Sequence, residues 1–145
     1  MEPIVDHIQI TVRDMQVAVP FYDRLMPLLG FDKQTRRVHT TIASHELEVC
    51  DYTHPKLGFC ISSPREPFKD DAVHRRRPGS LHHLAFRASS RAEVDTIHGA
   101  LTDLGATIVS APRVYPEYSP HYYAVFFKDP EGIKYEVVFD APESP

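Results

Sequence analysis

The sequence lacks the features that mark several large classes of protein. It has two cysteines, Cys50 and Cys60, and no tryptophan, and the two thiols do not have the spacing of a disulfide framework or a zinc knuckle. The chain does not begin with the basic segment and following apolar run of a signal peptide. No run approaches the ~18 apolar residues that a membrane-spanning helix needs. We therefore expect a cytoplasmic protein in a reducing compartment, with no membrane partner.

The chain also lacks a dominant charge of either sign. Its 16 Lys and Arg residues against 20 Asp and Glu residues give a formal net charge of -4, so no basic field favours nucleic acid as a partner. The basic cluster at residues 75–77 (Arg-Arg-Arg) is bounded by Pro78 and by Asp70 and Asp71, and it predicts a solvated loop rather than a phosphate site. The expected partner is a small-molecule substrate.

What the sequence does contain is an internal repeat. A shift of 76 positions without a gap places His7 on His83, and the register still holds where Ile61 falls on Val137. Each half begins with an alternating strand, continues with a helix and ends with shorter strand-like runs. We therefore predict an α+β fold of two paired βαβββ modules that form a curved mixed sheet. The chain would be one domain, residues 1–145, with a first module at about 3–62, a linker at 63–79 and a second module at about 80–140.

Capping residues mark the start of both helices. Asp14 and Ser90 are natural N-caps, and Ser90 with Glu93 makes a capping box ahead of an apolar periodicity. Pro20 stands about a turn inside the first helix, where a proline removes a backbone donor. It predicts a kink or a late start of that helix.

Strand alternation sorts the side chains of each first strand into two faces. The apolar residues must face the helix, which leaves His7 and Gln9 on the other face in the first half, and His83 and Arg87 on it in the second half. His82 shares the parity of the apolar residues, so we expect it on the helix side or at the surface. A sheet with a helix on one face leaves the other face uncovered, so the two halves must pair, with each other or with a second chain, around a shared concavity that suits a ligand.

The last strand adds a carboxylate to this concave face. Tyr135 and Val137 take the apolar side there, which leaves Glu136 facing the two histidines. Two imidazoles and a carboxylate suit Fe(II), Mn(II), Ni(II), Co(II) or Zn(II), with coordination positions left for substrate and water. We predict one divalent metal ion held by His7, His83 and Glu136.

Three pieces of the chain resemble the vicinal oxygen chelate superfamily, which includes glyoxalase I, bleomycin-resistance proteins, fosfomycin-resistance enzymes and extradiol dioxygenases. They are DHIQITVRDMQVAVPFYDRLMPLLGF, HHLAFRASSRAEVDTIHGALTDLGA and YYAVFFKDPEGIKYEVVF. The resemblance implies paired βαβββ modules, frequent dimers and metal ligands on the first and last strands, which are His7, His83 and Glu136 here. In glyoxalase I relatives a fourth ligand, usually a carboxylate, stands where this chain has Cys60. Cys60 is either a soft fourth ligand or a small residue that leaves the position to water or substrate.

Residues 112–127 (PRVYPEYSPHYYAVFF) lead toward the last strand and are rich in aromatic side chains. They are either aromatic packing in a rigid loop or a wall of the substrate site. On the second interpretation Tyr115 and Tyr118 bind substrate, and His121 or Tyr123 moves a proton.

Three further polar residues are candidates for the site. Arg87 could hold a carboxylate or phosphate in bidentate fashion, or could form a salt bridge. Gln9 faces the concavity and is a candidate substrate contact. Glu48 shares a face with Glu46 and is a candidate general base, although alternating glutamates are also typical of a solvated strand face.

The function implied by this resemblance is metal chelation of two adjacent oxygens, where the metal stabilises developing negative charge. We expect a divalent-metal-dependent, glyoxalase-like lyase or isomerase that acts on a small substrate as a homodimer. One alternative is an Fe(II) extradiol-type dioxygenase. The other is a metal-free protein of the bleomycin-binding type, which sequesters a ligand.

Overall fold

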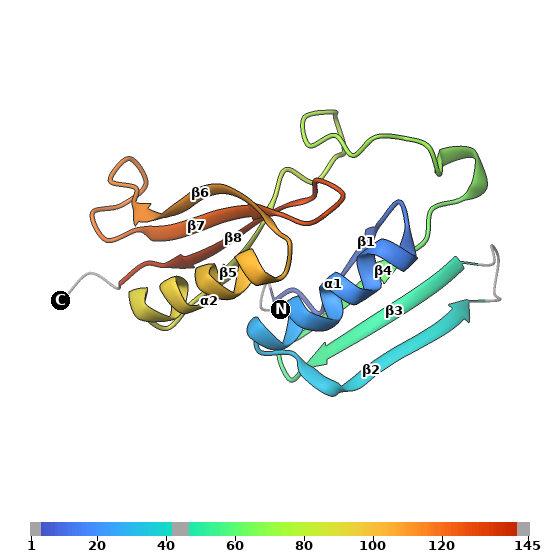
Figure 1. Cartoon of the computed structure of the whole chain (residues 1–145), viewed down its shortest axis with the longest axis horizontal. Coiled ribbons are helices and arrows are strands. Elements are labelled where there is room, and N and C mark those ends of the chain that lie inside the picture. The colour runs from blue at the N-terminus through green and yellow to red at the C-terminus, as the bar shows by residue number, and fades with distance from the viewer. Residues whose placement is uncertain (1–3, 42–46, 142–145) are drawn as a thin grey trace. The chain divides into compact units, whose positions relative to one another are not determined.

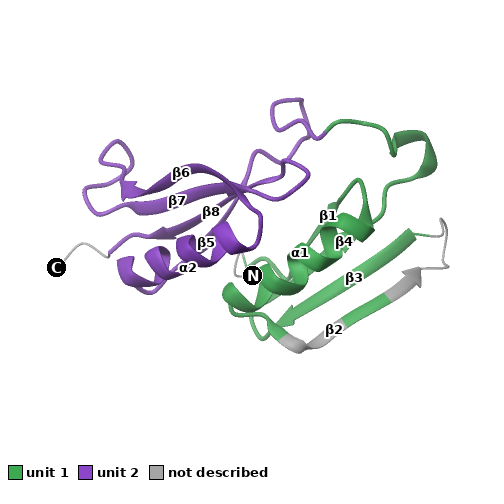
Figure 2. Cartoon of the chain, viewed as in Figure 1, with its two compact units in different colours: residues 1–72 green, residues 73–145 purple. Residues whose placement is uncertain are grey.

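A computed structural model of the chain describes residues 4–41 and 47–141, without the side chains of residues 33–36 and 39–41. The chain divides into two compact units, residues 1–72 and 73–145 (Figure 2). The boundary falls inside the predicted linker, so each unit contains one predicted module. None of the described helices is long and apolar enough to span a membrane.

Unit 1 is a four-stranded mixed sheet with one helix (Figure 1). Its elements are β1 (His7–Thr11), α1 (Met15–Leu28), β2 (Asp32–Thr41), β3 (Leu47–His54), β4 (Leu57–Ser62) and the 3-10 helix η1 (Glu66–Phe68). The strand order is β1-β4-β3-β2, with β1 parallel to β4 and the other neighbours antiparallel. The helix buries Tyr22 against the sheet, where its ring stacks on Phe59 at a centroid distance of 5.9 Å.

Unit 2 repeats this arrangement (Figure 1). Its elements are β5 (Leu84–Arg87), α2 (Arg91–Asp103), β6 (Thr107–Val114), β7 (Tyr123–Lys128) and β8 (Lys134–Phe139). The order is β5-β8-β7-β6, again with one parallel pair, β5 with β8. Both units are therefore βαβββ modules, which confirms the predicted α+β fold class.

The predicted helix caps are present in both units. The Asp14 carboxylate accepts a hydrogen bond from the backbone N–H two residues further on, at 2.8 Å. Ser90 Oγ accepts from the Glu93 N–H at 3.1 Å, while the Glu93 carboxylate reaches back to the backbone N–H of Ser89 at 2.6 Å. α1 begins directly after its cap and continues through Pro20, so the expected late start is wrong. The cap and the buried apolar face outweigh the one donor that the proline removes.

The strand register confirms the predicted faces. In unit 1, His7 lies opposite Gly58 and Gln9 lies opposite Cys60, while the apolar neighbours of these pairs are directed to the core. In unit 2, Glu136 lies between Ala85 of β5 and Phe126 of β7. The face of unit 2 that carries Glu136 also has its own buried cluster of Tyr115, Ala124, Phe126 and Val138, with Tyr122 packed against it. This second cluster positions the candidate site.

Candidate functional site

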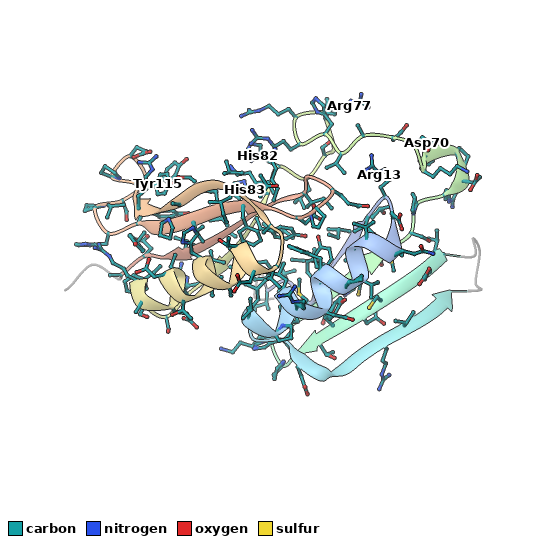
Figure 3. All side chains as sticks on the ribbon, in the orientation of Figure 1. Arg13, Asp70, Arg77, His82, His83 and Tyr115 are labelled. Carbon is teal, nitrogen blue, oxygen red and sulfur yellow. The ribbon has the colours of Figure 1, made fainter. Side chains whose placement is uncertain are left out.

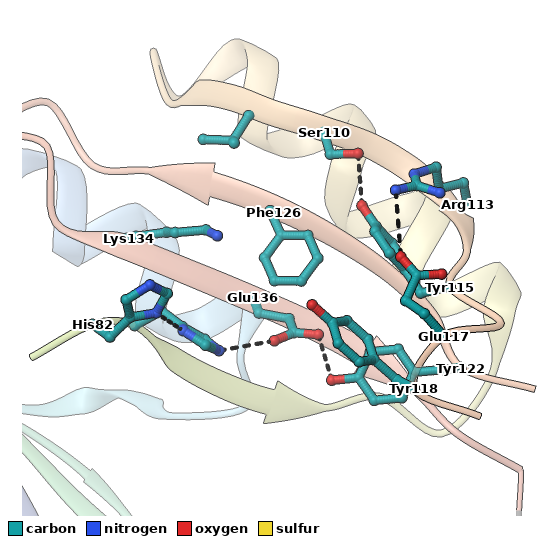
Figure 4. Close-up of a pocket in the computed structure, with 12 residues that line it drawn as sticks. His82, Ser110, Arg113, Tyr115, Glu117, Tyr118, Tyr122, Phe126, Lys134 and Glu136 are labelled. Carbon is teal, nitrogen blue, oxygen red and sulfur yellow. Dashed lines mark hydrogen bonds and ion pairs between the residues drawn. The ribbon is translucent and has the colours of Figure 1, made fainter. Parts of the chain in front are cut away.

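A pocket of about 600 Å³ opens over this face of unit 2 (Figure 4). β8 contributes Lys134 and Glu136, β7 contributes Phe126, and the segment 109–122 forms a wall with several tyrosines. His82 and His83 line the opposite side. All of these groups come from one module, so the geometry of the pocket follows from the fold of unit 2.

Glu136 is the buried acid of the pocket, with 2% of its surface exposed. Its Oε2 atom lies 3.2 Å from His83 Nε2, and its Oε1 atom accepts a hydrogen bond of 2.6 Å from the Tyr122 hydroxyl. Burial, and then the hydrogen bond to Glu136, raises the pKa of Tyr122, so this hydroxyl stays protonated and acts as a donor. The two contacts offset the cost of burying a carboxylate.

The two adjacent histidines both line the pocket, which corrects the expectation that His82 would face the helix or the surface. Their Nδ1 atoms lie 2.6 Å apart, and His82 Nε2 lies 3.4 Å from Arg75 Nη1. β5 begins at Leu84, so both histidines precede the strand, and the alternation of a pleated strand does not apply to them. His82 therefore joins His83 at the site.

The aromatic segment 112–127 packs its rings together and also places two of its tyrosines, Tyr115 and Tyr118, at the pocket, while their substrate role stays a prediction. Tyr115 is buried, its ring meets Phe126 edge-on at 5.3 Å, and it stacks with Tyr118 at 5.9 Å. The Tyr115 hydroxyl donates to Ser110 Oγ at 2.6 Å, and the Arg113 guanidinium lies 3.8 Å from the centre of its ring. Tyr115 and Tyr118 thus line the pocket as predicted, on a wall held by ring contacts and a hydrogen bond.

Three residues predicted for the site do not line this pocket. His121 is exposed in the loop before β7, and Arg87 is exposed on β5. Tyr123 points to the helix side, where its hydroxyl donates to the Asp95 carboxylate of α2 at 2.7 Å. Tyr122, which sequence reasoning did not single out, takes the place of Tyr123 at the pocket. The available signal was the aromatic segment itself, because Tyr122 precedes β7, which begins at Tyr123, and strand alternation does not extend to it.

The remaining predicted residues belong to unit 1. His7 begins β1, and its Nδ1 atom lies 2.7 Å from the carboxylate of Asp6, beside a second pocket of about 800 Å³. Gln9 and Glu48 are exposed on β1 and β3. Glu46 lies outside the described residues. The roles of His7, Gln9 and Glu48 stay predictions.

Without a bound metal, Cys60 is a neutral thiol. Burial, followed by a hydrogen bond with Asp51, raises the pKa of its thiol from 9.0 to about 12. The thiolate is the form that binds metals, so Cys60 carries its proton at neutral pH. A bound metal ion would itself deprotonate a coordinating thiol, so both interpretations of Cys60 stay predictions.

The family of the chain follows from comparison with known proteins. The sequence model of the Glyoxalase/Bleomycin resistance protein/Dioxygenase superfamily matches residues 4–137. The chain belongs to this superfamily. An uncharacterized protein of Bacillus subtilis (strain 168), YqjT, is 30% identical over 132 residues, which cover 91% of this chain and 95% of that protein.

Solved structures of the superfamily share the fold. A glyoxalase candidate from Bacillus halodurans is 28% identical, with a TM-score of 0.72 and coverage of 96% of this chain and 97% of that one. The fosfomycin resistance protein FosX from Listeria monocytogenes, in complex with Mn(II) and sulfate, has a TM-score of 0.64 over 99% of this chain and 97% of that one. FosX is 16% identical, so it is a relative in fold.

The donor set of unit 2 fits a divalent ion of the kind that superfamily members bind. Two ligands that are each about 2.1 Å from an ion stand about 3.0 Å apart at a right angle and about 3.4 Å apart at a tetrahedral angle. His83 Nε2 and Glu136 Oε2 are 3.2 Å apart, between these values. Across residues 4–41 and 47–141, no group of three or more His, Cys, Asp or Glu side chains could hold an ion. Unit 2 contains two of the three predicted ligands, His83 and Glu136, and their role as ligands stays a prediction.

Proposed function

We propose that this chain is a divalent-metal-dependent, glyoxalase-like lyase or isomerase, which acts on a small substrate with two adjacent oxygens. His7, His83 and Glu136 would hold the metal. The observation that carries the proposal is the buried Glu136 carboxylate, which faces the His83 imidazole at 3.2 Å in an open pocket. An imidazole and a buried carboxylate add little to stability compared with apolar packing, so their place in a pocket of this size supports a role in binding.

The residues around the pair would orient it. A bound divalent ion would supply positive charge to two substrate oxygens as negative charge develops on them. Tyr122 holds Oε1 of Glu136 and leaves Oε2 toward His83. For Nε2 of His83 to act as a ligand, its hydrogen must reside on Nδ1, where His82 can accept it. Glu48 remains the proposed general base, on the exposed part of β3.

Elemental analysis of the protein, purified without chelators, tests the proposal. We expect about one divalent ion per site in the wild-type protein and the loss of most of it in His83→Ala and Glu136→Gln. His121→Ala is the matched control, because this exposed imidazole does not line the pocket, and it should retain the metal. Wild-type protein without stoichiometric metal would contradict the proposal. Oxygen consumption with catechols after ferrous reconstitution would instead identify a dioxygenase.

A second function, ligand sequestration without a metal, is supported by a specific observation. The Glu136 carboxylate already has two partners within the protein, the His83 imidazole and the Tyr122 hydroxyl. Four aromatic rings line the same pocket. Such a wall can bind a planar ligand with no metal. A metal-free protein that binds ligand in this pocket would favour this function.

We also propose that the chain forms a homodimer. The sheet face opposite the helix retains exposed side chains in both units, such as Gln9 on β1 and Arg87 on β5, and an uncovered sheet face needs a partner surface. Light scattering coupled to size-exclusion chromatography should give twice the mass of the 16.5 kDa chain. A monomer at micromolar concentration would contradict this proposal.

A further inference from the structure

Four cationic side chains gather beside the pocket, around the turn between β7 and β8. Arg75, Arg76 and Lys128 line a cavity of about 310 Å³. Lys134 lines the neighbouring pocket that contains Glu136. The four charges therefore occupy one region of unit 2.

Contacts through His82 join the cavity to the pocket. Arg75 lines the cavity, and its Nη1 atom lies 3.4 Å from Nε2 of His82, which lines the pocket. The Lys134 ammonium lies over the Phe126 ring at 4.3 Å, directed into the pocket (Figure 4).

Close ion pairs are missing from this cluster in the described part of the chain, where the charge of Glu136 acts on Lys134 only beyond ion-pair distance. Among the residues that the structure describes, none of the four cations forms an ion pair with an Asp or Glu, whereas Lys69 pairs with Glu66 and Arg113 lies 4.0 Å from Glu117. The whole chain has 20 acidic and 16 basic residues, so acids are not scarce. Like charges that are brought together in a partly desolvated region repel one another, and a bound anion would relieve this repulsion.

We propose that Arg75, Arg76, Lys128 and Lys134 form an anion subsite that binds a phosphate group of the substrate. This inference rests on the proposed function and names its substrate class, a small phosphorylated compound. Two guanidinium groups and two ammonium groups offer more donors than one carboxylate can accept, whereas a phosphate has three terminal oxygens and up to about two negative charges. The phosphate lies against the cluster, and the adjacent oxygens reach His83 and Glu136.

The position of Arg77 provides a matched control. The sequence predicted a solvated loop for residues 75–77, and the structure agrees for Arg77, which is exposed and lines neither cavity. Figure 3 shows Arg77 at the outer end of its loop, apart from His82 and His83. Arg75, by contrast, is half-buried against His82. A comparison of Arg76→Gln with Arg77→Gln therefore distinguishes a specific subsite from a general effect of net charge on anion binding.

Isothermal titration of the purified protein with inorganic phosphate and pyrophosphate, at constant ionic strength, tests the subsite. We expect saturable binding, weakened about tenfold or more in Arg76→Gln and in Lys128→Gln and unchanged in Arg77→Gln. Succinate is the carboxylate probe and should bind more weakly than pyrophosphate. No binding to the wild-type protein, equal losses in Arg76→Gln and Arg77→Gln, or tighter binding of succinate would each overturn the proposal.

A parallel measurement separates this inference from the proposed function. Repeating the titration with His83→Ala, which we expect to lack metal, excludes binding of pyrophosphate to the metal itself. Retained binding in this variant supports the subsite, and lost binding contradicts it. The metal content of wild-type protein tests the proposed function independently, because a metal-free protein that still binds pyrophosphate would contradict only the enzyme proposal.

Discussion

The Nδ1 atoms of His82 and His83 lie 2.6 Å apart, so a single hydrogen stands between the two rings. A guanidinium can only donate, so Arg75 donates to Nε2 of His82, which leaves the hydrogen of that neutral ring on Nδ1. His82 then donates to Nδ1 of His83, which leaves the hydrogen of a neutral His83 ring on Nε2, the atom that lies 3.2 Å from Oε2 of Glu136. The directions of the two hydrogen bonds follow from one arginine, and a metal on Nε2 of His83 requires the tautomers of both rings to reverse.

Loss of the Tyr122 hydroxyl should destabilise the fold. Tyr122→Phe leaves Oε1 of the buried Glu136 without its donor, which should lower the free energy of unfolding by about 1–3 kcal/mol. Urea denaturation followed by circular dichroism measures the change. Tyr118→Phe is the control, because this tyrosine is 64% exposed, and we expect a change within about 0.5 kcal/mol. Equal effects of the two substitutions would count against the buried hydrogen bond.

Asp6 should act as a positioning residue for His7. Its carboxylate lies 2.7 Å from Nδ1 of His7, and such a partner fixes the tautomer and the orientation of a metal-binding imidazole. We expect Asp6→Asn to weaken metal binding about 10- to 100-fold in competition with a chromogenic chelator. Asp71→Asn, in the exposed linker, should leave the affinity unchanged. An unchanged affinity in Asp6→Asn would show that His7 needs no such support.

A side chain at position 58 should displace His7. A Cβ atom added to Gly58 would lie 3.0 Å from Cβ of His7 on the neighbouring strand, so β1 and β4 must shift. We expect Gly58→Ala to destabilise unit 1 by about 1–3 kcal/mol and to weaken metal binding, both measured on the same preparation. Gly99→Ala in α2 adds a methyl group in open space, and it should be neutral or stabilising by up to about 1 kcal/mol. A fully stable Gly58→Ala variant with normal metal affinity would contradict the expected displacement of His7.

The raised pKa of Cys60 makes the folded state sensitive to alkaline pH. The thiol has a pKa of about 12 in the folded chain, against a usual value of 9.0, so the unfolded chain releases this proton first. Stability from the buried neutral thiol is therefore complete below about pH 9 and is lost progressively as the pH rises toward 12. Between these pH values the free energy of unfolding should fall more steeply for the wild-type protein than for Cys60→Ala. Parallel pH profiles of the two proteins would refute this expectation.

Much of the fold could be predicted from the sequence, because the repeat and the strand alternation are local patterns with a direct structural meaning. Those patterns placed Glu136 on the face opposite the apolar residues, and the register agrees, with Ala85 of β5 opposite Glu136 of β8. Prediction failed where the pattern stops. His82 precedes β5, and strand parity has no meaning outside a paired strand. The half-buried position of Arg75 depends on its contact with His82, and no local periodicity encodes a contact between a loop and the pocket.

β5 connects His83, a predicted metal ligand, to the start of α2. The capping box of α2 follows its last residue, and His83 immediately precedes its first. Parallel pairing with β8 holds the strand between these points, and the Ala88 N–H extends that pairing by donating to the Val138 carbonyl at 2.7 Å. A slip of one residue would move His83 along β8 by about 3.3 Å and turn the strand over. The capped start of α2 therefore helps to fix the register of β5, and with it the position of the His83 imidazole beside the Glu136 carboxylate.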